Sequence, residues 1–243
     1  MPSDDVYLSV RQLLSSLIGK ERSRELTESF QEQFGTLPGM LETVDRYGQR
    51  TGIPEGARTL LSMVPGLYQV CALEKIGPSP LLDTLIRAGK YAHFQYVNAQ
   101  YEGVKLLCLD RDYRLIECCS SGEGGVKDVA FYPRKLLIDA FRTKAHAVIL
   151  CHNHPSDWPH FSEADINATR ELVAAFTQVG IPLLDHLLVA GRQLNSMRSR
   201  AYIPEPLWMR TGPNGIPLAR WRAGLGPATG VTQESINNTT QIP

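Results

Sequence analysis

Residues 145–155 read AHAVILCHNHP, and this stretch decides how the rest of the chain is interpreted. The apolar residues before the histidines are rich in strand formers, which predicts a buried strand that leads into them. Side chains two residues apart on a strand point to the same face. His152 and His154 are therefore expected to project together, while Cys151 points away. Pro155 is expected to end the strand.

A helix is predicted to begin a short loop later. Ser162 and Asp165 form a capping-box pattern, and Gly180 marks the end of the apolar helical spacing that follows. The inward positions of that helix are Ile166, Thr169, Leu172, Val173 and Phe176. The loop is short enough to bring Asp165 beside His152 and His154. Two imidazoles and a carboxylate, with one position left for water, are the ligands of a catalytic zinc site, so the sequence predicts Zn²⁺ here.

Each of these residues also has an ordinary structural interpretation. Ser162 can serve only as a helix cap, with its hydroxyl on a backbone N–H. Single histidines are usually solvated or satisfied within a core. A pair on one strand face, followed by an acidic residue at a helix start, is harder to attribute to packing. Both roles stay open for Ser162, since a cap does not exclude a place in the site.

The segment from His152 to Ser156, together with Ser162 and Asp165, resembles the JAMM (JAB/MPN) metalloprotease motif. That motif has an upstream glutamate, then His-x-His-Pro, a serine, and an aspartate three residues after the serine. Asn153 and the Pro-Ser pair give it the form of the RadC branch. Further similar pieces are Glu102 with Leu109-Asp110, Arg114-Leu115-Ile116, Gly124, Tyr132-Pro133-Arg134 and Asp185-His186. The resemblance extends over roughly residues 80–200.

The resemblance implies an α/β (α+β) fold of the JAB/MPN type, a mixed sheet flanked by helices. It also implies a zinc-dependent hydrolase that cleaves an amide or isopeptide bond in a protein or peptide substrate. By position, Glu102 would be the general base and Ser162 would stabilise the oxyanion. From the residues alone, Glu102 is an exposed carboxylate at the start of a strand, and Glu117 and Glu163 are weaker candidates for the base.

The chain departs from the RadC pattern beside the motif. RadC proteins usually carry Gly-Asp-Pro-Thr-Pro where residues 157–161 read DWPHF. The length is kept, so the ligands should survive, but the bulk of Trp158 and Phe161 is expected to narrow or reshape access for the substrate. Asp185 and His186 lie in a predicted core strand, where they either orient ligands or make a structural hydrogen bond.

Residues 1–78 are predicted to form a helical region. Within it, residues 64–68 resemble the turn of a helix-hairpin-helix, with Tyr68 in place of the second glycine. Such turns direct backbone N–H groups at DNA phosphates. The net charge is zero, which provides no global attraction to nucleic acid, so DNA is a weakly supported partner.

Residues 79–203 are expected to hold the RadC-like domain. Ser79 and Pro80 are predicted to open a helix over residues 81–88. Strands are expected at residues 106–110, 114–119 and 126–132, then a helix at residues 133–141 with Leu136, Leu137, Ala140 and Phe141 inward. Residues 204–243 are more than a quarter Pro and Gly, which is typical of a flexible tail.

Composition limits the remaining alternatives. Five cysteines without a framework spacing favour a reduced, cytoplasmic protein, and no apolar run is long enough to span a membrane. The alternative function is a DNA-processing or DNA-repair accessory protein, either nuclease-like and metal-dependent or non-catalytic. Phosphodiester cleavage usually uses magnesium on carboxylates or two metals. The predicted ligands instead favour zinc and a carbonyl substrate.

Overall fold

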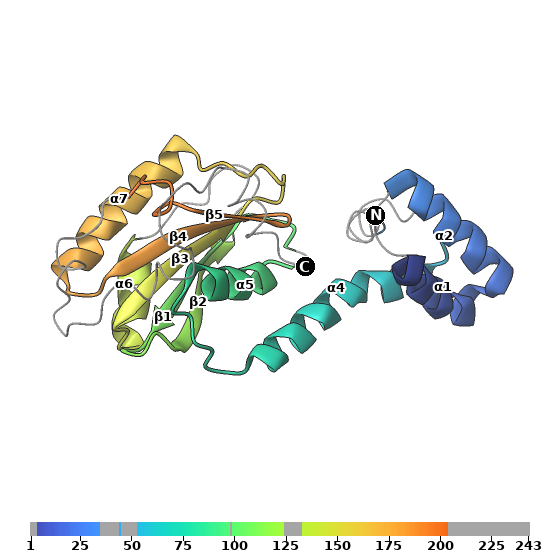
Figure 1. The fold of residues 1–243 in the computed structure, drawn as a ribbon, viewed down its shortest axis with the longest axis horizontal. Helices are drawn as coiled ribbons and strands as arrows, with labels where there is room; N and C mark the ends of the chain where they lie inside the picture. Colours follow the sequence, from blue (N-terminus) through green and yellow to red (C-terminus); the bar gives the residue numbers. More distant parts are fainter. Residues whose placement is uncertain (1–3, 35–43, 45–52, 98, 124–132, 204–243) are drawn as a thin grey trace, which may run out of the picture. The chain divides into compact units, whose positions relative to one another are not determined.

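The computed structural model describes residues 4–34, 44, 53–97, 99–123 and 133–203 of the chain (Figure 1). The chain divides into two compact units, Met1–Ala72 and Leu73–Pro243, which are described separately. The predicted strand at residues 126–132 and the predicted tail at residues 204–243 lie outside the described residues. None of the helices within the described ranges has the length and apolar character needed to cross a membrane.

The first unit is helical, as predicted. It contains α1 (Asp4–Ile18), α2 (Lys20–Phe34) and most of α4 (Glu55–Ile76). Gly19 separates α1 from α2 with a φ of +84°, a left-handed conformation that glycine adopts without a steric penalty. An apolar cluster holds the helices together, and its buried members are Val10, Leu14, Phe30, Val44, Ile53, Ala57 and Leu61.

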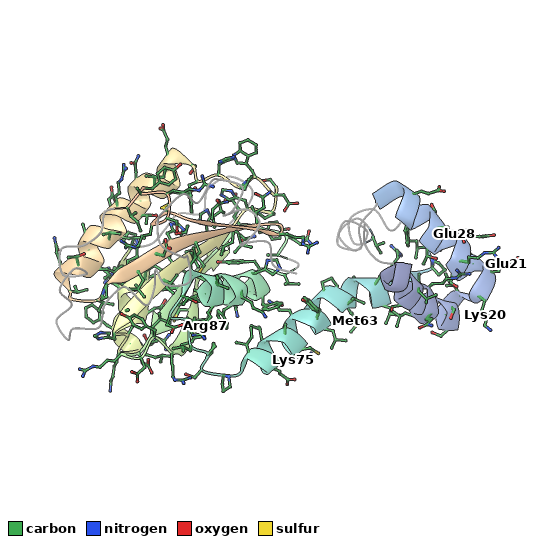
Figure 2. The ribbon with its side chains drawn as sticks, in the orientation of Figure 1. Lys20, Glu21, Glu28, Met63, Lys75 and Arg87 are labelled. Carbon is green, nitrogen blue, oxygen red and sulfur yellow. The ribbon has the colours of Figure 1, made fainter. Side chains whose placement is uncertain are left out.

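The predicted hairpin turn at residues 64–68 is wrong, because these residues lie inside the continuous helix α4. Pro65 costs that helix one backbone hydrogen bond. Burial of Ala57 and Leu61 in the apolar cluster fixes the preceding turns and offsets this cost. The backbone N–H groups of this segment therefore belong to a helix instead of a phosphate-binding turn. Met63 lies on the exposed side of α4 (Figure 2).

The second unit is built on a five-stranded mixed sheet, which confirms the predicted fold class (Figure 1). In sheet order the strands are β2 (Leu115–Glu123), β1 (Gly103–Leu109), β3 (Ala147–Asn153), β4 (Leu183–Ala190) and β5 (Gln193–Ser196). Among the strands that the structure describes, only the β3–β4 pair is parallel, and the other three pairs are antiparallel. The parallel pair requires a crossover, which α7 (Glu163–Gln178) provides between β3 and β4.

Helices cover both faces of this sheet. Side chains of α5 (Leu85–Gln95) share one buried apolar cluster with the sheet, and side chains of α6 (Pro133–Arg142) and α7 share another. The central strand β3 alternates between them. Ile149 and Cys151 face the α5 cluster, while Val148 and Leu150 face the α6–α7 cluster. Cys151 therefore points away from the histidines, as predicted.

The predicted helix at residues 81–88 begins later than expected. Thr84 caps α5 by accepting from Arg87 N, and the Arg87 side chain also pairs with Asp83 at 2.6 Å. Pro80 instead lies beside the start of β2, where its carbonyl accepts from Leu115 N. Pairing with the hairpin keeps this segment extended.

Helix α6 buries the predicted Leu136 and Ala140, with Leu137 half-buried. Phe141 was expected to face inward but is 55% exposed. It lies beyond the apolar stripe, at the last turn of the helix.

Candidate metal centre

The three predicted ligands converge at one end of the β3–α7 crossover. His152 lies near the end of β3, His154 follows it, and Asp165 lies in the first turn of α7. One ligand atom from each residue lies within 4.8 Å of the other two. The two Nε2 atoms of the histidines are 3.1 Å apart, and His152 Nε2 is 3.8 Å from Asp165 Oδ2.

These distances fit a single zinc ion. Zinc–nitrogen bonds of 2.0–2.1 Å in a tetrahedral site place two ligand atoms about 3.3 Å apart. The separations between His152 and its two partners lie on either side of that value. Two nitrogen donors and one carboxylate oxygen also leave a fourth position open, which is typical of a catalytic site. The residues present could therefore hold a metal.

The loop after β3 sets the tautomer of His154. Its Nδ1 lies 2.8 Å from the carbonyl oxygen of Trp158. A carbonyl only accepts, so Nδ1 carries the proton and donates it. In the neutral ring the Nε2 of His154 then keeps its lone pair, which faces the other histidine.

His152 is 4% exposed. Burial is the main cause that lowers its pKa, to about 4, and the nearby Asp165 carboxylate partly opposes this shift. The ring is therefore neutral near pH 7, the state that can ligate a metal. Its Nδ1 lies 2.7 Å from Nε2 of His186, which comes from β4. The contact with His152 supports the first of the two predicted roles for His186, that of orienting a candidate metal ligand. The Asp185 side chain instead accepts a hydrogen bond from Ser196.

Ser162 and Asp165 form the predicted capping box. The backbone N–H and the hydroxyl of Ser162 donate to Asp165 Oδ2 at 2.8 and 2.7 Å. Asp165 N donates to Ser162 Oγ at 3.1 Å. The Ser162 hydroxyl proton therefore points at the carboxylate, and these bonds orient Asp165 toward the histidines.

Glu102 immediately precedes β1, next to the histidine strand. Val104 pairs with His152 in the antiparallel register. Carrying that register to the next residue of the same face brings Glu102 opposite His154. The Asn153 side chain holds the backbone on both sides of Glu102. It accepts from Gly103 N at 2.8 Å and donates to the carbonyl of Tyr101 at 3.1 Å.

The unusual loop contributes one half-buried ring and one exposed ring. Phe161 packs against His152 and His186, with ring centroids 5.8 and 5.5 Å away, and so forms a wall of the site. Trp158 is 63% exposed. Asn195 on β5 anchors the loop by donating to the carbonyl of Pro159 at 2.7 Å. The expected effect of this loop on substrate access stays a prediction.

The sequence pattern predicts no role in the site for two residues that contact it. Asn153 belongs to the RadC-like motif, and its amide lies between two histidines, where it can hold a neighbouring strand. Thr169 was expected to be inward. Its hydroxyl makes it the one polar member of an apolar helical stripe, and a buried hydroxyl needs a partner. That partner is His186, 2.6 Å away.

A family model for the RadC-like JAB domain matches residues 82–202. A UPF0758 protein of Shewanella amazonensis is 35% identical over 202 residues, which are 83% of this chain and 89% of that protein. The chain belongs to the RadC-like JAB domain family. A UPF0758 protein of Methylibium petroleiphilum is 28% identical over 180 residues, covering 74% of this chain and 81% of the relative. A third, from Alteromonas mediterranea, is 26% identical over 201 residues, or 81% of this chain and 89% of the relative.

The RadC-like JAB match includes every residue assigned to the site. It contains the three convergent ligands and also Glu102 and Ser162. The family resemblance drawn from the motif is therefore confirmed. The roles of Glu102 and Ser162 stay predictions.

Proposed function

We propose that this protein is a zinc-dependent hydrolase that cleaves an amide bond, peptide or isopeptide, in a protein or peptide substrate. The observation that carries the proposal is the convergence of His152, His154 and Asp165, with the two Nε2 atoms 3.1 Å apart. A lone pair from His154 faces its neighbour across this gap. A metal cation between the two histidine nitrogens and the Asp165 carboxylate would bind all three groups.

The residues around the ligands have complementary tasks. Zinc, when bound, supplies a Lewis acid that lowers the pKa of water to about 7. Glu102 takes the proton of the attacking water and returns it to the leaving amine. Ser162 donates to the oxygen of the amide carbonyl as negative charge develops on it. Because its hydroxyl now donates to Asp165, it has to turn away from that carboxylate to do so.

The ligand set favours a carbonyl substrate over a phosphodiester. Two imidazoles and one carboxylate suit zinc, whereas magnesium and paired-metal sites that cleave phosphodiesters are rich in carboxylates. The zero net charge of the chain adds no attraction for DNA.

The test compares wild type with Glu102→Gln in three measurements: metal content, cleavage of a peptide library and cleavage of DNA. Removing a general base should lower peptide hydrolysis by about 10²–10⁴-fold. Metal content should stay at one zinc per chain, because Glu102 is not a ligand. Glu163→Gln is the matched control, since it makes the same chemical change on the exposed first turn of α7 and should keep activity.

Several outcomes would contradict the proposal. Loss of zinc in Glu102→Gln would make that residue a ligand instead of the base. A loss of hydrolysis confined to Glu163→Gln would move the base to Glu163. DNA cleavage without peptide cleavage, abolished by Glu102→Gln, would favour the DNA-processing alternative. His154→Ala should lose bound zinc, and a retained stoichiometric ion would overturn the ligand assignment.

A further inference from the structure

A chain of buried polar side chains lies behind the metal centre. It runs from His152 on β3 to His186 on β4 and then to Thr169 on α7. These side chains are 4%, 0% and 0% exposed, so water does not compete for their hydrogen bonds. The chain ends at the backbone carbonyl of Asp165, which lies 2.6 Å from Thr169 Oγ1. The two ends of the chain are therefore two of the three candidate ligands.

The position of each proton follows from that carbonyl. The Asp165 carbonyl can only accept, and two oxygens 2.6 Å apart need a proton between them, so the Thr169 hydroxyl donates to it. With its single proton committed, Thr169 Oγ1 accepts from His186 Nδ1, which is 2.6 Å away. The proton of His186 is thus on Nδ1.

The remaining hydrogen bonds follow from the surroundings of the His186 ring. The ring is fully buried, and its Nδ1 and Nε2 face a hydroxyl and a second imidazole, which are uncharged groups, so the neutral ring fits this environment. A neutral ring with a proton on Nδ1 has a lone pair on Nε2. That lone pair accepts from Nδ1 of His152 at 2.7 Å. His152 therefore carries its proton on Nδ1 and has an unprotonated Nε2, as His154 does.

We propose that His186 and Thr169 are positioning residues that hold His152 in the tautomer able to bind metal and tie its ring to the backbone of the ligand Asp165. The inference rests on the proposed function only in requiring a metal at this site. The bonds of a bound ion would close the chain into a ring, from His152 through His186 and Thr169 to Asp165. The site is then prepared before metal arrives, because its two nitrogen donors already face each other unprotonated.

Packing supports this assignment. The Phe161 ring lies against both His152 and His186, so it restricts rotation of the two imidazoles. A reversed chain, with the Thr169 hydroxyl donating to His186, would place a proton on Nε2 of His152. It would also leave two oxygens 2.6 Å apart without a proton between them. The two arrangements differ in a measurable property, the tautomer of His152.

The first measurement is made on metal-free wild-type protein with a chelator present. Long-range proton–nitrogen NMR correlations distinguish the two tautomers of each histidine. We expect His152, His154 and His186 all to carry the proton on Nδ1. A proton on Nε2 of His152 would overturn the proposal, whatever the activity of the enzyme.

The second measurement is zinc affinity, by competition with a chromophoric chelator. Thr169→Val keeps the shape of the side chain but removes the hydroxyl, and should weaken zinc binding by about 10- to 100-fold. Thr169→Ser restores the hydroxyl and should recover affinity. Thr177→Val is the matched control, because Thr177 makes the same hydroxyl bond, to the carbonyl of Val173 at 2.6 Å, at an exposed position two turns along α7. It should bind zinc as wild type does.

His186→Gln provides a separate test, since its amide can accept from His152 and donate to Thr169. It should retain more zinc affinity than His186→Leu. Unchanged zinc affinity in both Thr169→Val and His186→Leu, with folding verified by circular dichroism, would mean that these hydrogen-bonded side chains have only a structural role. Absence of zinc binding by wild type would overturn the metal site and this proposal together. Zinc binding with the expected tautomers but no hydrolysis would overturn only the proposed function.

Discussion

Asp185 and His186 are adjacent on β4 and both are fully buried, yet their side chains serve opposite faces of the sheet. His186 lies beside Leu150 of β3 and contacts His152 of the candidate metal centre. Asp185 lies beside Ile149, on the other face. Its carboxylate accepts from Ser196 Oγ at 2.5 Å and from Arg198 N at 3.0 Å, which ties β5 and the following turn to β4.

This contrast shows that burial and polarity do not by themselves identify a residue of the site. The partner decides the role. Removal of Asp185 should act on stability and leave metal affinity alone, while changes to His186 or Thr169 should lower metal affinity. Three further predictions test this division, in decreasing order of expected effect.

The largest effect is expected from Asp185→Ala. The change removes the acceptor for the backbone N–H groups of His186 and Arg198 and for the hydroxyl of Ser196. Leaving buried donors without a partner should lower the free energy of unfolding by roughly 3–5 kcal/mol. Denaturant titration measures this loss, and the folded fraction should still bind zinc stoichiometrically. A small loss of stability accompanied by loss of zinc would instead assign Asp185 to the site.

The pH dependence of stability gives an intermediate effect. Burial is the main cause that raises the pKa of Asp185 from 3.8 to about 6. The folded state therefore binds this proton more tightly than the unfolded state. The resulting stabilisation is complete below about pH 4 and is lost as the pH rises through 6, a change of about 3 kcal/mol.

Asp185→Asn isolates this contribution. His152 has a lowered pKa and gives the opposite slope in metal-free protein, so wild type and variant are compared by denaturant titration across pH 4–7. The difference between their stabilities should change over this range. Two parallel curves would mean that Asp185 does not titrate in this window.

The smallest effect concerns the turn after β4, which touches the loop beside the metal centre. A Cβ added at Gly191 would lie 2.7 Å from Asp157 Oδ1, and the φ of +52° there is left-handed. Gly180 also has a positive φ, +72°, but open space around it. Both Gly→Ala variants should lose about 1–2 kcal/mol through backbone strain.

Only Gly191→Ala should also weaken zinc binding, because Asp157 neighbours the Trp158 carbonyl that holds His154. This loss of affinity should be smaller than that of Thr169→Val. Equal zinc affinity in the two glycine variants would show that the turn and the loop are independent.

The parts of the site that the sequence predicts are local. Alternation along β3 orients His152 and His154, and the capping pattern orients Asp165, so spacing is sufficient for these three. The role of His186 depends on a register shift between β3 and β4 at Val148 and Ile149. A slip of one residue exchanges the two faces of a strand, so periodicity alone could not decide between Asp185 and His186.

Packing between distant segments also explains why two other sequence predictions, the turn at Pro65 and the helix start at Pro80, are wrong. The sequence around Pro65 favours a turn, but burial of the preceding helical residues keeps α4 continuous. Pro80 is a favourable first residue of a helix, but pairing with Leu115 holds it extended. In each case the deciding contact is with another segment of the chain.

The closeness of the ligands in the sequence has a consequence for folding. All three come from one strand, one short loop and the first turn of one helix, so bringing them together costs little loop-closure entropy. Glu102 immediately precedes β1 and joins them only when β1 pairs with β3, a pairing that the hydrogen bond from Gly103 N to the Asn153 side chain accompanies. A partly folded chain, or one still being synthesised, is therefore expected to bring the three candidate ligands together while β1 is unpaired. Strand pairing, instead of metal capture, would then be the step that completes the candidate active site.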